Sequence, residues 1–247
     1  MNILITGAGS GIGKSLAEYY ATHGNVLLLM GRNLDNLTFV QTICRNKGAD
    51  VYIKSIDVTD RTSMEEALKE WEEKHPIDLV IANAGVRSIQ ENPDREEIDR
   101  LLQTNLYGVL NTVLPLIEPM KKRKSGHIAV ISSLAAYRTF PYRGAYTASK
   151  AAVKMFCEGW RVELSPYGIA VSTVYPGFVE TPLTAHKDHP MPFIISAEES
   201  AKRIAAGLEK KKANISFPLP VFLIMRLLQA LPDQLVAYIM KKVIKIN

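Results

Sequence analysis

The sequence predicts a doubly wound α/β fold, in which a sheet of about seven parallel strands carries helices on both faces. Short apolar runs of strand length alternate along most of the chain with longer segments of helical periodicity. Strands joined through helices form parallel sheets with right-handed crossovers. Small and polar residues follow several of the apolar runs, at the carboxyl ends of strands where such sheets bind ligands.

The composition is that of a globular protein, and we expect one domain over residues 1–247. The chain is 47% hydrophobic and 22% charged, with a net charge of +5, which excludes the fibrous and disordered classes. Basic residues cluster only at 121–124, 210–212 and 241–242, and no aromatic residues interleave them. A nucleic-acid groove requires that interleaving, so we expect no nucleic-acid partner.

Both the cysteines and the amino-terminal segment indicate a cytoplasmic location. Cys44 and Cys157 have no metal-ligand spacing and are too few for a disulfide framework, which suits a reducing compartment. The chain starts directly in the apolar run 3–5, without the basic region, long hydrophobic stretch and cleavage site of a signal peptide.

A glycine-rich turn lies between the first predicted strand and a helical segment at 14–23. Its sequence over residues 6–13 is TGAGSGIG. Glycines let the backbone approach a pyrophosphate, and the helix N-terminus supplies amide donors and positive potential. A tight turn without a ligand is the alternative interpretation. The residues expected to contact a dinucleotide here are Gly7, Ser10, Gly11, Ile12 and Gly13.

The second predicted strand, 26–30, ends at Gly31 and Arg32. In dinucleotide-binding folds an acid in this region binds the ribose 2′-hydroxyl, whereas an arginine accommodates a 2′-phosphate. No acid is present, and the Arg32 guanidinium can make bidentate, charge-assisted contacts with phosphate. The predicted cofactor is therefore NADP(H), with Lys14 and Asn33 as helpers. An exposed arginine at a helix start is the alternative.

The third predicted strand, 51–56, ends at Asp57 and Val58. The Asp57 carboxylate is placed to accept a hydrogen bond from an adenine amino group, although capping or turn formation also explains an aspartate there. A helix is predicted over 61–74, with Thr59 or Asp60 as its N-cap.

Two more strands are predicted at 77–82 and 126–132, with a long helix over 94–118 between them. The first of these strands leads into an Asn-Ala-Gly sequence, and the second into Ser133. Asparagine is a poor residue for a helix interior because its side chain competes for backbone hydrogen bonds. Asn105 therefore indicates a local kink in the long helix.

Tyr146 and Lys150 are four residues apart, which places them on one face of a helix, one turn apart. A free phenol titrates near about 10, and a nearby ammonium lowers that pKa. The pair is a candidate proton donor or acceptor, although the same spacing is common in solvated surface helices.

Together these motifs resemble the main type of the short-chain dehydrogenase/reductase family, over residues 1 to about 184. The resemblance implies a single Rossmann-like domain. The glycine-rich turn matches the family's cofactor signature, and residues 83–85 match its strand-four motif. The residues that match its motif after strand six are Pro176, Gly177 and Thr181, and those that match its catalytic tetrad are Asn105, Ser133, Tyr146 and Lys150.

The resemblance implies a role for each member of the tetrad. Tyr146 would exchange a proton with the substrate oxygen while a hydride passes between the nicotinamide and the carbonyl carbon. Lys150 would lower the pKa of the phenol and hold the nicotinamide ribose. Ser133 would hydrogen-bond the substrate oxygen, and Asn105 would hold a water through its backbone. The remaining cofactor contacts that the resemblance implies are Asp57, Val58, Asn83, Ala84, Gly85, Pro176, Gly177, Val179 and Thr181.

The function expected from this resemblance is hydride transfer between NADP(H) and a carbonyl or secondary alcohol, on a small-to-medium apolar substrate. Residues 31–32 resemble those of the NADP-preferring members of the family. The alternative is a catalytically silent protein that senses NADP(H). Enoyl reduction is disfavoured because relatives with that activity space the tyrosine and lysine more widely. The resemblance also implies a homodimer or homotetramer through the helices that contain Asn105 and Tyr146.

Beyond about residue 184 the resemblance becomes weaker, because members of the family generally diverge there. We expect a substrate loop at 183–196, a helix at 197–210 and a seventh strand at 213–217. His186 and His189 lie in this loop, but no cysteine or carboxylate pattern joins them, so no metal site is expected.

The last segment, 218–245, is predicted to form two short amphipathic helices around Pro232. Its apolar runs fall short of a membrane span. Three roles are open, in order of preference: closing the substrate cleft, packing on another subunit, or making peripheral contact with a membrane surface.

Overall fold

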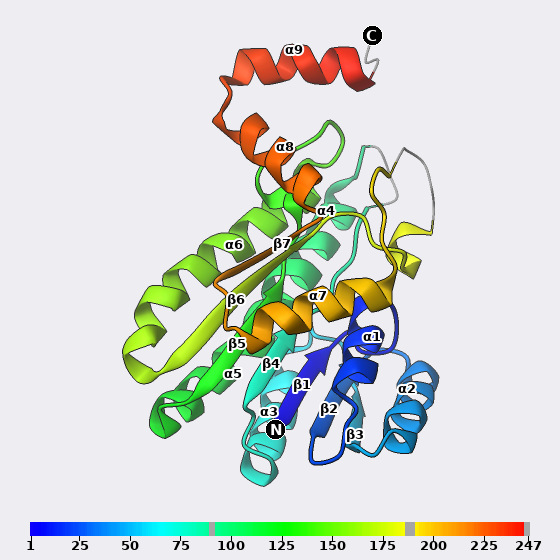
Figure 1. The fold of residues 1–247 in the computed structure, drawn as a ribbon, viewed down its shortest axis with the longest axis vertical. Helices are drawn as coiled ribbons and strands as arrows, with labels where there is room; N and C mark the ends of the chain where they lie inside the picture. Colours follow the sequence, from blue (N-terminus) through cyan, green and yellow to red (C-terminus); the bar gives the residue numbers. More distant parts are fainter. Residues whose placement is uncertain (89–91, 186–190, 245–247) are drawn as a thin grey trace.

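The computed structural model describes residues 1–88, 92–185 and 191–244. Its centre is one parallel sheet of seven strands in the order β3-β2-β1-β4-β5-β6-β7 (Figure 1). This confirms the predicted fold class. The strands are β1 (Asn2–Thr6), β2 (Val26–Gly31), β3 (Asp50–Ser55), β4 (Leu79–Ala82), β5 (Gly126–Ile131), β6 (Ile169–Pro176) and β7 (Asn214–Phe217).

Helices cover both faces of the sheet, which explains why the central strands are continuous apolar runs. One face packs against α1, α2 and α7, through side chains such as Leu16, Leu37 and Ile204. The other packs against α3, α5 and α6, through side chains such as Leu68 and Leu116. The helices are α1 (Gly11–Tyr20), α2 (Leu34–Asn46), α3 (Arg61–Lys74), α4 (Arg95–Leu102), α5 (Gly108–Arg123), α6 (Gly144–Leu164), α7 (Ala197–Glu209), α8 (Leu219–Ala230) and α9 (Asp233–Ile244).

Local contacts explain one helix end that differs from the prediction and one helix start that agrees with it. The first helix ends at Tyr20 rather than 23, because Asn25 Nδ2 donates to the Tyr20 carbonyl at 2.9 Å. The third helix has the N-cap that the sequence allowed, since the Asp60 carboxylate accepts from the Ser63 amide at 3.1 Å.

The predicted helix over 94–118 is present as α4 and α5, which a π-helical turn at Gln103–Tyr107 joins. The Gly108 amide donates to the Gln103 carbonyl five residues back, as a π turn requires. Asn105 lies inside this turn, so the expected kink is confirmed. Its side chain bonds the backbone of Val86 instead of its own helix.

The last segment forms α8 and α9, on either side of Pro232, as predicted (Figure 1). In the described part of the chain, no helix is both long and apolar enough to cross a membrane. Within the expected substrate loop, a 3₁₀ turn occupies Pro182–Thr184 and an isolated bridge joins Val179 to Ile195. The histidines at 186 and 189 lie outside the described residues.

Candidate cofactor-binding and active site

The strand order reverses between β1 and β4, which is where doubly wound sheets bind ligands. The two strand ends are tied together through Thr6 and Asn83. Thr6 Oγ1 accepts from the backbone amides of Asn83 at 3.1 Å and Ala84 at 3.2 Å. In return, Asn83 Nδ2 donates to the Thr6 carbonyl at 3.0 Å. These bonds hold the glycine-rich turn against the Asn-Ala-Gly sequence predicted to share its site.

The glycine-rich turn can be made only with glycine at two of its positions. Gly7 has φ +65°, and a Cβ on it would lie 2.9 Å from the Ala84 Cα. A Cβ on Gly13 would lie 2.3 Å from the Gly7 carbonyl oxygen. The sequence TGAGSGIG therefore fixes the close packing of α1 on the end of β1.

The N-terminus of α1 has no side-chain cap, in contrast to those of four other helices. A side-chain oxygen caps each of α2, α3, α4 and α7, from Asn33, Asp60, Asp94 and Ser196 respectively. Ser10 makes no side-chain cap on α1, and no acid lies in its first turn. The first-turn amides of α1 thus remain available to bind an anion, and this fits the pyrophosphate of a dinucleotide.

The predicted 2′-phosphate residue, Arg32, lies at the end of β2 with 69% of its side chain exposed. Its Nη1 is 3.8 Å from Asp57 Oδ2 at the end of the neighbouring strand. The other carboxylate oxygen of Asp57 accepts from the Thr59 amide and hydroxyl, both at 2.9 Å. Asp57 therefore stabilises the turn after β3, which was the alternative explanation for an aspartate there. Asn33 and Lys14 were the two expected helpers of Arg32. The Asn33 side chain caps α2 by accepting from the Asn36 amide at 2.8 Å. Lys14 Nζ lies 5.1 Å from the centroid of the Phe39 ring.

Ser133, Tyr146 and Lys150 meet where β5 ends beside α6. Ser133 acts on the Tyr146 phenol by lowering its pKa, and the Ser133 hydroxyl accepts from the Ala135 amide at 3.1 Å. Lys150 is buried, and its Nζ donates to the Ile131 carbonyl at 2.9 Å. The structure therefore brings three of the four predicted catalytic residues to one strand end.

Burial is the largest cause of the pKa shifts of Tyr146 and Lys150. It raises the pKa of Tyr146, against lowering contributions from Ser133 and the positive charge of Arg87. The net shift of the phenol pKa is upward, and the groups that oppose it are Ser133 and Arg87, so the lowering by Lys150 stays a prediction. Burial also lowers the pKa of Lys150 itself to about 8, because a desolvated ammonium loses its hydration.

Asn105 acts through its side chain as a brace behind the tyrosine. Its Oδ1 accepts from the Val86 amide at 2.8 Å and its Nδ2 donates to the Val86 carbonyl at 2.9 Å. Nδ2 also donates to Ser149 Oγ at 3.2 Å, and this hydroxyl donates to the Tyr146 carbonyl at 2.7 Å. The π turn thereby links the loop after β4 to the first turns of α6. The backbone role implied by the family resemblance stays a prediction.

Gly85 leaves room between these groups. A Cβ added there would lie 3.2 Å from Asn105 Oδ1 and 3.4 Å from Lys150 Nζ. A side chain at this position would push against both residues, so the glycine of the Asn-Ala-Gly sequence permits the lysine and the asparagine to approach the end of β4.

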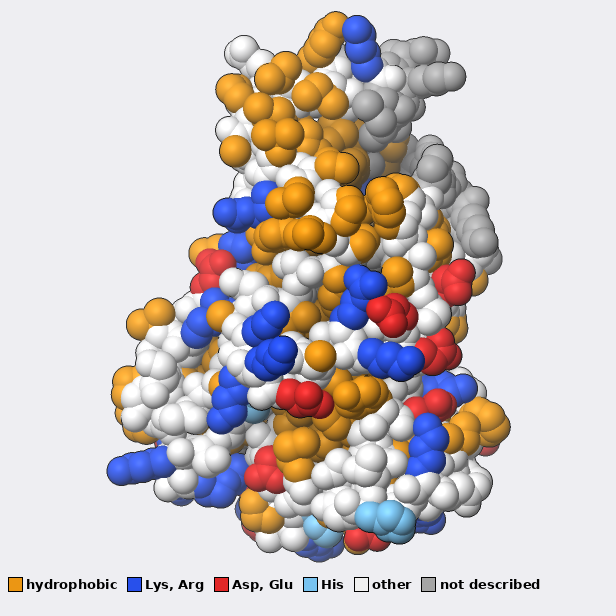
Figure 2. Space-filling model, in the orientation of Figure 1, with side chains coloured by type: hydrophobic (Ala, Val, Ile, Leu, Met, Phe, Trp, Pro, Cys, Tyr) orange, Lys and Arg blue, Asp and Glu red, His pale blue; other side chains and the backbone are white. Residues whose placement is uncertain are grey.

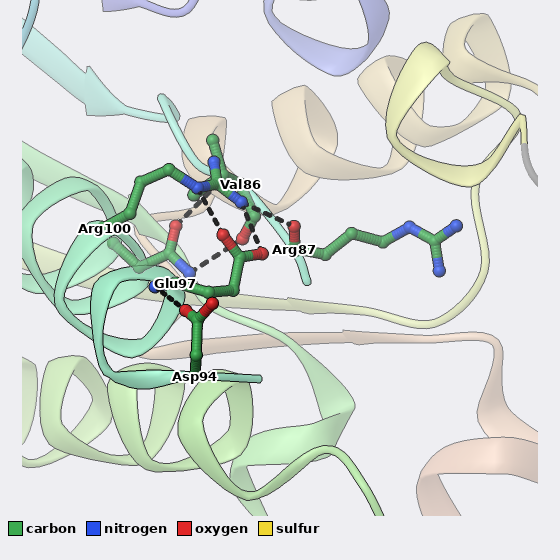
Figure 3. Close-up of polar contacts among 6 residues, drawn as sticks. Val86, Arg87, Asp94, Glu97 and Arg100 are labelled. Atoms are coloured by element: carbon green, nitrogen blue, oxygen red, sulfur yellow. Dashed lines mark hydrogen bonds and ion pairs between the residues drawn. The ribbon is translucent and has the colours of Figure 1, made fainter. Parts of the chain in front are cut away.

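Arg87 is a residue of this site that the sequence analysis missed. Arg100 Nη2 donates to its backbone carbonyl at 3.2 Å, and Arg100 is held in turn by Glu97 at 2.7 Å (Figure 3). The Asp94 carboxylate caps the same helix through the Glu97 amide at 2.8 Å. The side chain of Arg87 points away from this cluster (Figure 3), and its charge acts on the Tyr146 phenol. The available signal was its position two residues after Gly85.

The segment after β6 closes the same edge of the sheet. A Cβ on Gly11 would lie 2.9 Å from Thr181 Cγ2, so this segment lies against the glycine-rich turn. The Gly177 amide donates to the Phe217 carbonyl at 2.7 Å, which anchors the segment to β7, and Val179 is buried. The predicted contacts at 176–181 thus lie opposite the N-terminus of α1.

No cluster of three or more histidine, cysteine, aspartate or glutamate side chains that could hold a metal occurs among residues 1–88, 92–185 and 191–244. The groups assembled at the sheet edge are a phenol, an ammonium, hydroxyls and helix amides. These are groups that bind a dinucleotide and exchange protons.

The fold and this site define an α/β oxidoreductase of the dinucleotide-binding class. The chain belongs to the short chain dehydrogenase family, whose model matches residues 1–191. It is 34% identical over 236 residues to an uncharacterized oxidoreductase of Myxococcus xanthus, covering 94% of this chain and 93% of the relative.

The chain is also similar to two proteins with a named activity. The chain is 32% identical to the fatty acyl-CoA reductase of Acinetobacter baylyi, over 86% of this chain and 74% of the relative. The crystal structure of an alcohol dehydrogenase from Thermococcus sibiricus complexed with 5-hydroxy-NADP superposes with a TM-score of 0.78 at 26% identity. That similarity covers 87% of this chain and 95% of the other.

Proposed function

We propose that this protein transfers a hydride between NADP(H) and a carbonyl or secondary alcohol on a small-to-medium apolar substrate. The observation that carries the proposal is that Lys150 Nζ on α6 donates to the carbonyl of Ile131, at the end of β5, at 2.9 Å. Tyr146 lies one helical turn before Lys150, and Ser133, just after β5, lowers the pKa of its phenol. Bound at this edge of the sheet, the nicotinamide cofactor would supply or accept the hydride.

The protein's own residues would handle the oxygen and its proton. Because burial raises the pKa of Tyr146, the phenol keeps its proton at neutral pH and can donate it to the oxygen of a carbonyl undergoing reduction. The Ser133 hydroxyl would donate a second hydrogen bond to that oxygen as negative charge develops on it. Lys150 would hold the nicotinamide ribose, and Asn105, through Ser149, keeps the Tyr146 backbone in place.

The apolar character of the substrate is supported by the side chains next to Ser133. Leu134, Tyr137 and Tyr175 form a buried cluster there with Met225 of α8. The similarity to a fatty acyl-CoA reductase points the same way. A carbonyl panel should therefore include aldehydes and ketones of increasing chain length, assayed by loss of NADPH absorbance. Tight NADPH binding without turnover on any of them would favour the sensor function instead.

For the cofactor, Arg32 supports NADP(H) over NAD(H), because its exposed guanidinium lies at the end of β2, where a 2′-phosphate is bound in such folds. The neighbouring carboxylate of Asp57 would then share that guanidinium with the phosphate. The T. sibiricus structure, which holds an NADP derivative, is consistent with this.

Calorimetric titration tests the cofactor preference. We expect wild-type protein to bind NADPH roughly tenfold to a hundredfold more tightly than NADH, since a charge-assisted pair contributes about 1.5–3 kcal/mol. Arg32→Ala should remove that difference by weakening NADPH alone. Arg61→Ala, another exposed arginine paired with a carboxylate, is the matched control and should change neither affinity. Equal affinities in the wild type would exclude the preference.

A further inference from the structure

Helix α8 is apolar on two opposite sides, and only one of them is covered. Phe222 and Met225 turn inward and pack with Tyr137 and Tyr175 beside the candidate active site. This inner side supports the first predicted role of the segment, which is to close the substrate cleft. The outer side is exposed, with Leu227 62% accessible to solvent. The other exposed apolar residues of α8 are Leu219, Leu223 and Ile224.

Helix α9 extends this exposed apolar surface. Leu235 and Tyr238 are exposed on it, whereas Val236 and Met240 are buried. Both helices project from the sheet-and-helix body at the end farthest from the amino terminus (Figure 1). Figure 2 shows hydrophobic side chains gathered over them. The exposed apolar residues of α8 and α9 named above are here called the terminal apolar surface.

The charges on these two helices are almost all positive. Residues 219–244 contain the cations Arg226, Lys241 and Lys242 and the single acid Asp233. That acid is already paired, since its Oδ1 accepts from Arg138 Nη2 at 2.7 Å. Two of the cations lie by aromatic rings: Arg226 is 5.5 Å from the Tyr137 ring centroid and Lys242 Nζ is 4.9 Å from that of Tyr238.

We propose that the terminal apolar surface docks on the face of a lipid bilayer that contains anionic headgroups. A 12-residue helix such as α8 is about 18 Å long, too short to cross a bilayer but suited to lie along its surface. Leucines would enter the acyl boundary while the cations reach the headgroups. A second copy of the chain is a poorer occupant, because a two-fold interface would bring together the cations of both copies, while the one acid of residues 219–244 is already paired with Arg138.

Docking would place the candidate active site close to the lipid. Leu134, which follows Ser133, belongs to the same buried cluster as Met225 on the inner side of α8. Apolar substrates dissolved in the bilayer would then reach the protein without crossing water. The docking itself does not depend on the proposed reaction, and its test needs no substrate.

Co-sedimentation with vesicles tests the proposal on the full chain. We expect binding to phosphatidylglycerol–phosphatidylcholine vesicles, weaker binding in high salt, and little binding to phosphatidylcholine alone. Leu227→Gln and Leu223→Gln should each lower the partition coefficient roughly tenfold, because each removes apolar area from the lipid contact. Leu34→Gln, at a residue 53% exposed on α2, is the matched control and should bind as the wild type does.

A separate variant tests how much the positive charges contribute to vesicle binding. Lys242→Glu keeps the apolar surface but reverses one charge, and it should weaken binding to anionic vesicles roughly tenfold or more. Equal binding to both vesicle types, no binding to either, or wild-type binding by Leu227→Gln with an unchanged far-ultraviolet spectrum would overturn the proposal. So would light scattering in the absence of lipid that shows Leu227→Gln to be a smaller oligomer than the wild type, since a second copy would then cover the surface.

Discussion

At the scale of single residues, burial controls the chemistry of the candidate site. It opposes the charged form of both Tyr146 and Lys150, so it raises the pKa of the phenol and lowers that of the ammonium to about 8. Ser133 and the charge of Arg87 limit the first shift. A phenol that is protonated at neutral pH suits proton donation during carbonyl reduction.

Tyr146→Phe should preserve the fold and cofactor binding but remove turnover. Losing one hydroxyl changes the free energy of unfolding by about 1–2 kcal/mol at most, whereas general acid–base catalysis contributes roughly 10²–10⁴-fold to the rate. The loss should appear in kcat as well as kcat/KM. Lys150→Met, in contrast, should weaken NADPH binding too. Steady-state kinetics and cofactor titration of both variants check this, and near wild-type kcat in Tyr146→Phe would refute the assignment.

Arg87→Leu should move the alkaline limit of carbonyl reduction to higher pH. Removing a positive charge favours the neutral phenol, so the pKa of Tyr146 rises further and the protonated form persists to higher pH. Measurement of kcat/KM against pH tests the shift, and Arg87→Lys should restore the wild-type limit. Arg95→Leu, on the exposed side of α4, is a control for general charge effects. A profile unchanged in Arg87→Leu would remove this residue from the site.

At the scale of elements, strands were the most predictable part of the chain. The run at 26–30 is apolar throughout because helices cover both faces of the sheet there, and no other element explains such a run so simply. The π turn could not be predicted from periodicity, since both parts of the predicted helix have the same 3.6-residue pattern. Asn105 marked its position, but its partner Val86 lies 19 residues away and becomes adjacent only in the fold.

A buried histidine joins two central strands and gives stability a pH dependence. His127 of β5 has Nε2 2.8 Å from Ser172 Oγ of β6, and this hydroxyl donates to the Lys212 carbonyl at 2.7 Å. The imidazole therefore donates to the serine in its neutral form. Burial, and to a smaller extent the charge of Lys211, lower the pKa of His127 to about 4.

His127→Gln should flatten the acid side of the stability curve. Between about pH 6.5 and pH 4 the unfolded chain binds a proton at this histidine that the folded chain does not. Stability from the neutral imidazole is thus full above about pH 6.5 and declines as the pH falls, by about 3 kcal/mol near pH 4. Urea unfolding at pH 7, 5.5 and 4.5 measures this. The same decline in wild type and variant would exclude His127 as its source.

At the scale of the whole molecule, the candidate site was predictable because its motifs follow successive strands that end at one edge of the sheet. The sequence does not show how close residues at the ends of different strands lie to one another along that edge. Arg32 and Asp57 end up 3.8 Å apart because β2 and β3 are neighbours, with Gly31 paired to Ser55. Arg87 was missed for the same reason, since its effect on Tyr146 depends on how the loop after β4 packs beside α6.

Helices α5 and α6 carry exposed apolar residues on the side away from the sheet, and we propose that this side joins two copies of the chain. Val162 is 76% exposed, and Leu114 and Met155 are also exposed. These residues lie on the helices that the family resemblance predicts at a subunit interface. Such an interface would bury them and hold the π turn and the start of α6, with Tyr146, in fixed positions.

Light scattering at micromolar concentration should therefore give a mass that is a multiple of the 27.5 kDa chain. Met155→Glu together with Val162→Glu should yield the monomer, because each carboxylate would lose its hydration in an apolar interface. Leu227→Gln, on α8, should leave the oligomer intact, which separates this interface from the terminal apolar surface. Since the braces around Tyr146 lie within one chain, the monomeric variant should retain cofactor binding. A 27.5 kDa wild type would contradict the predicted assembly.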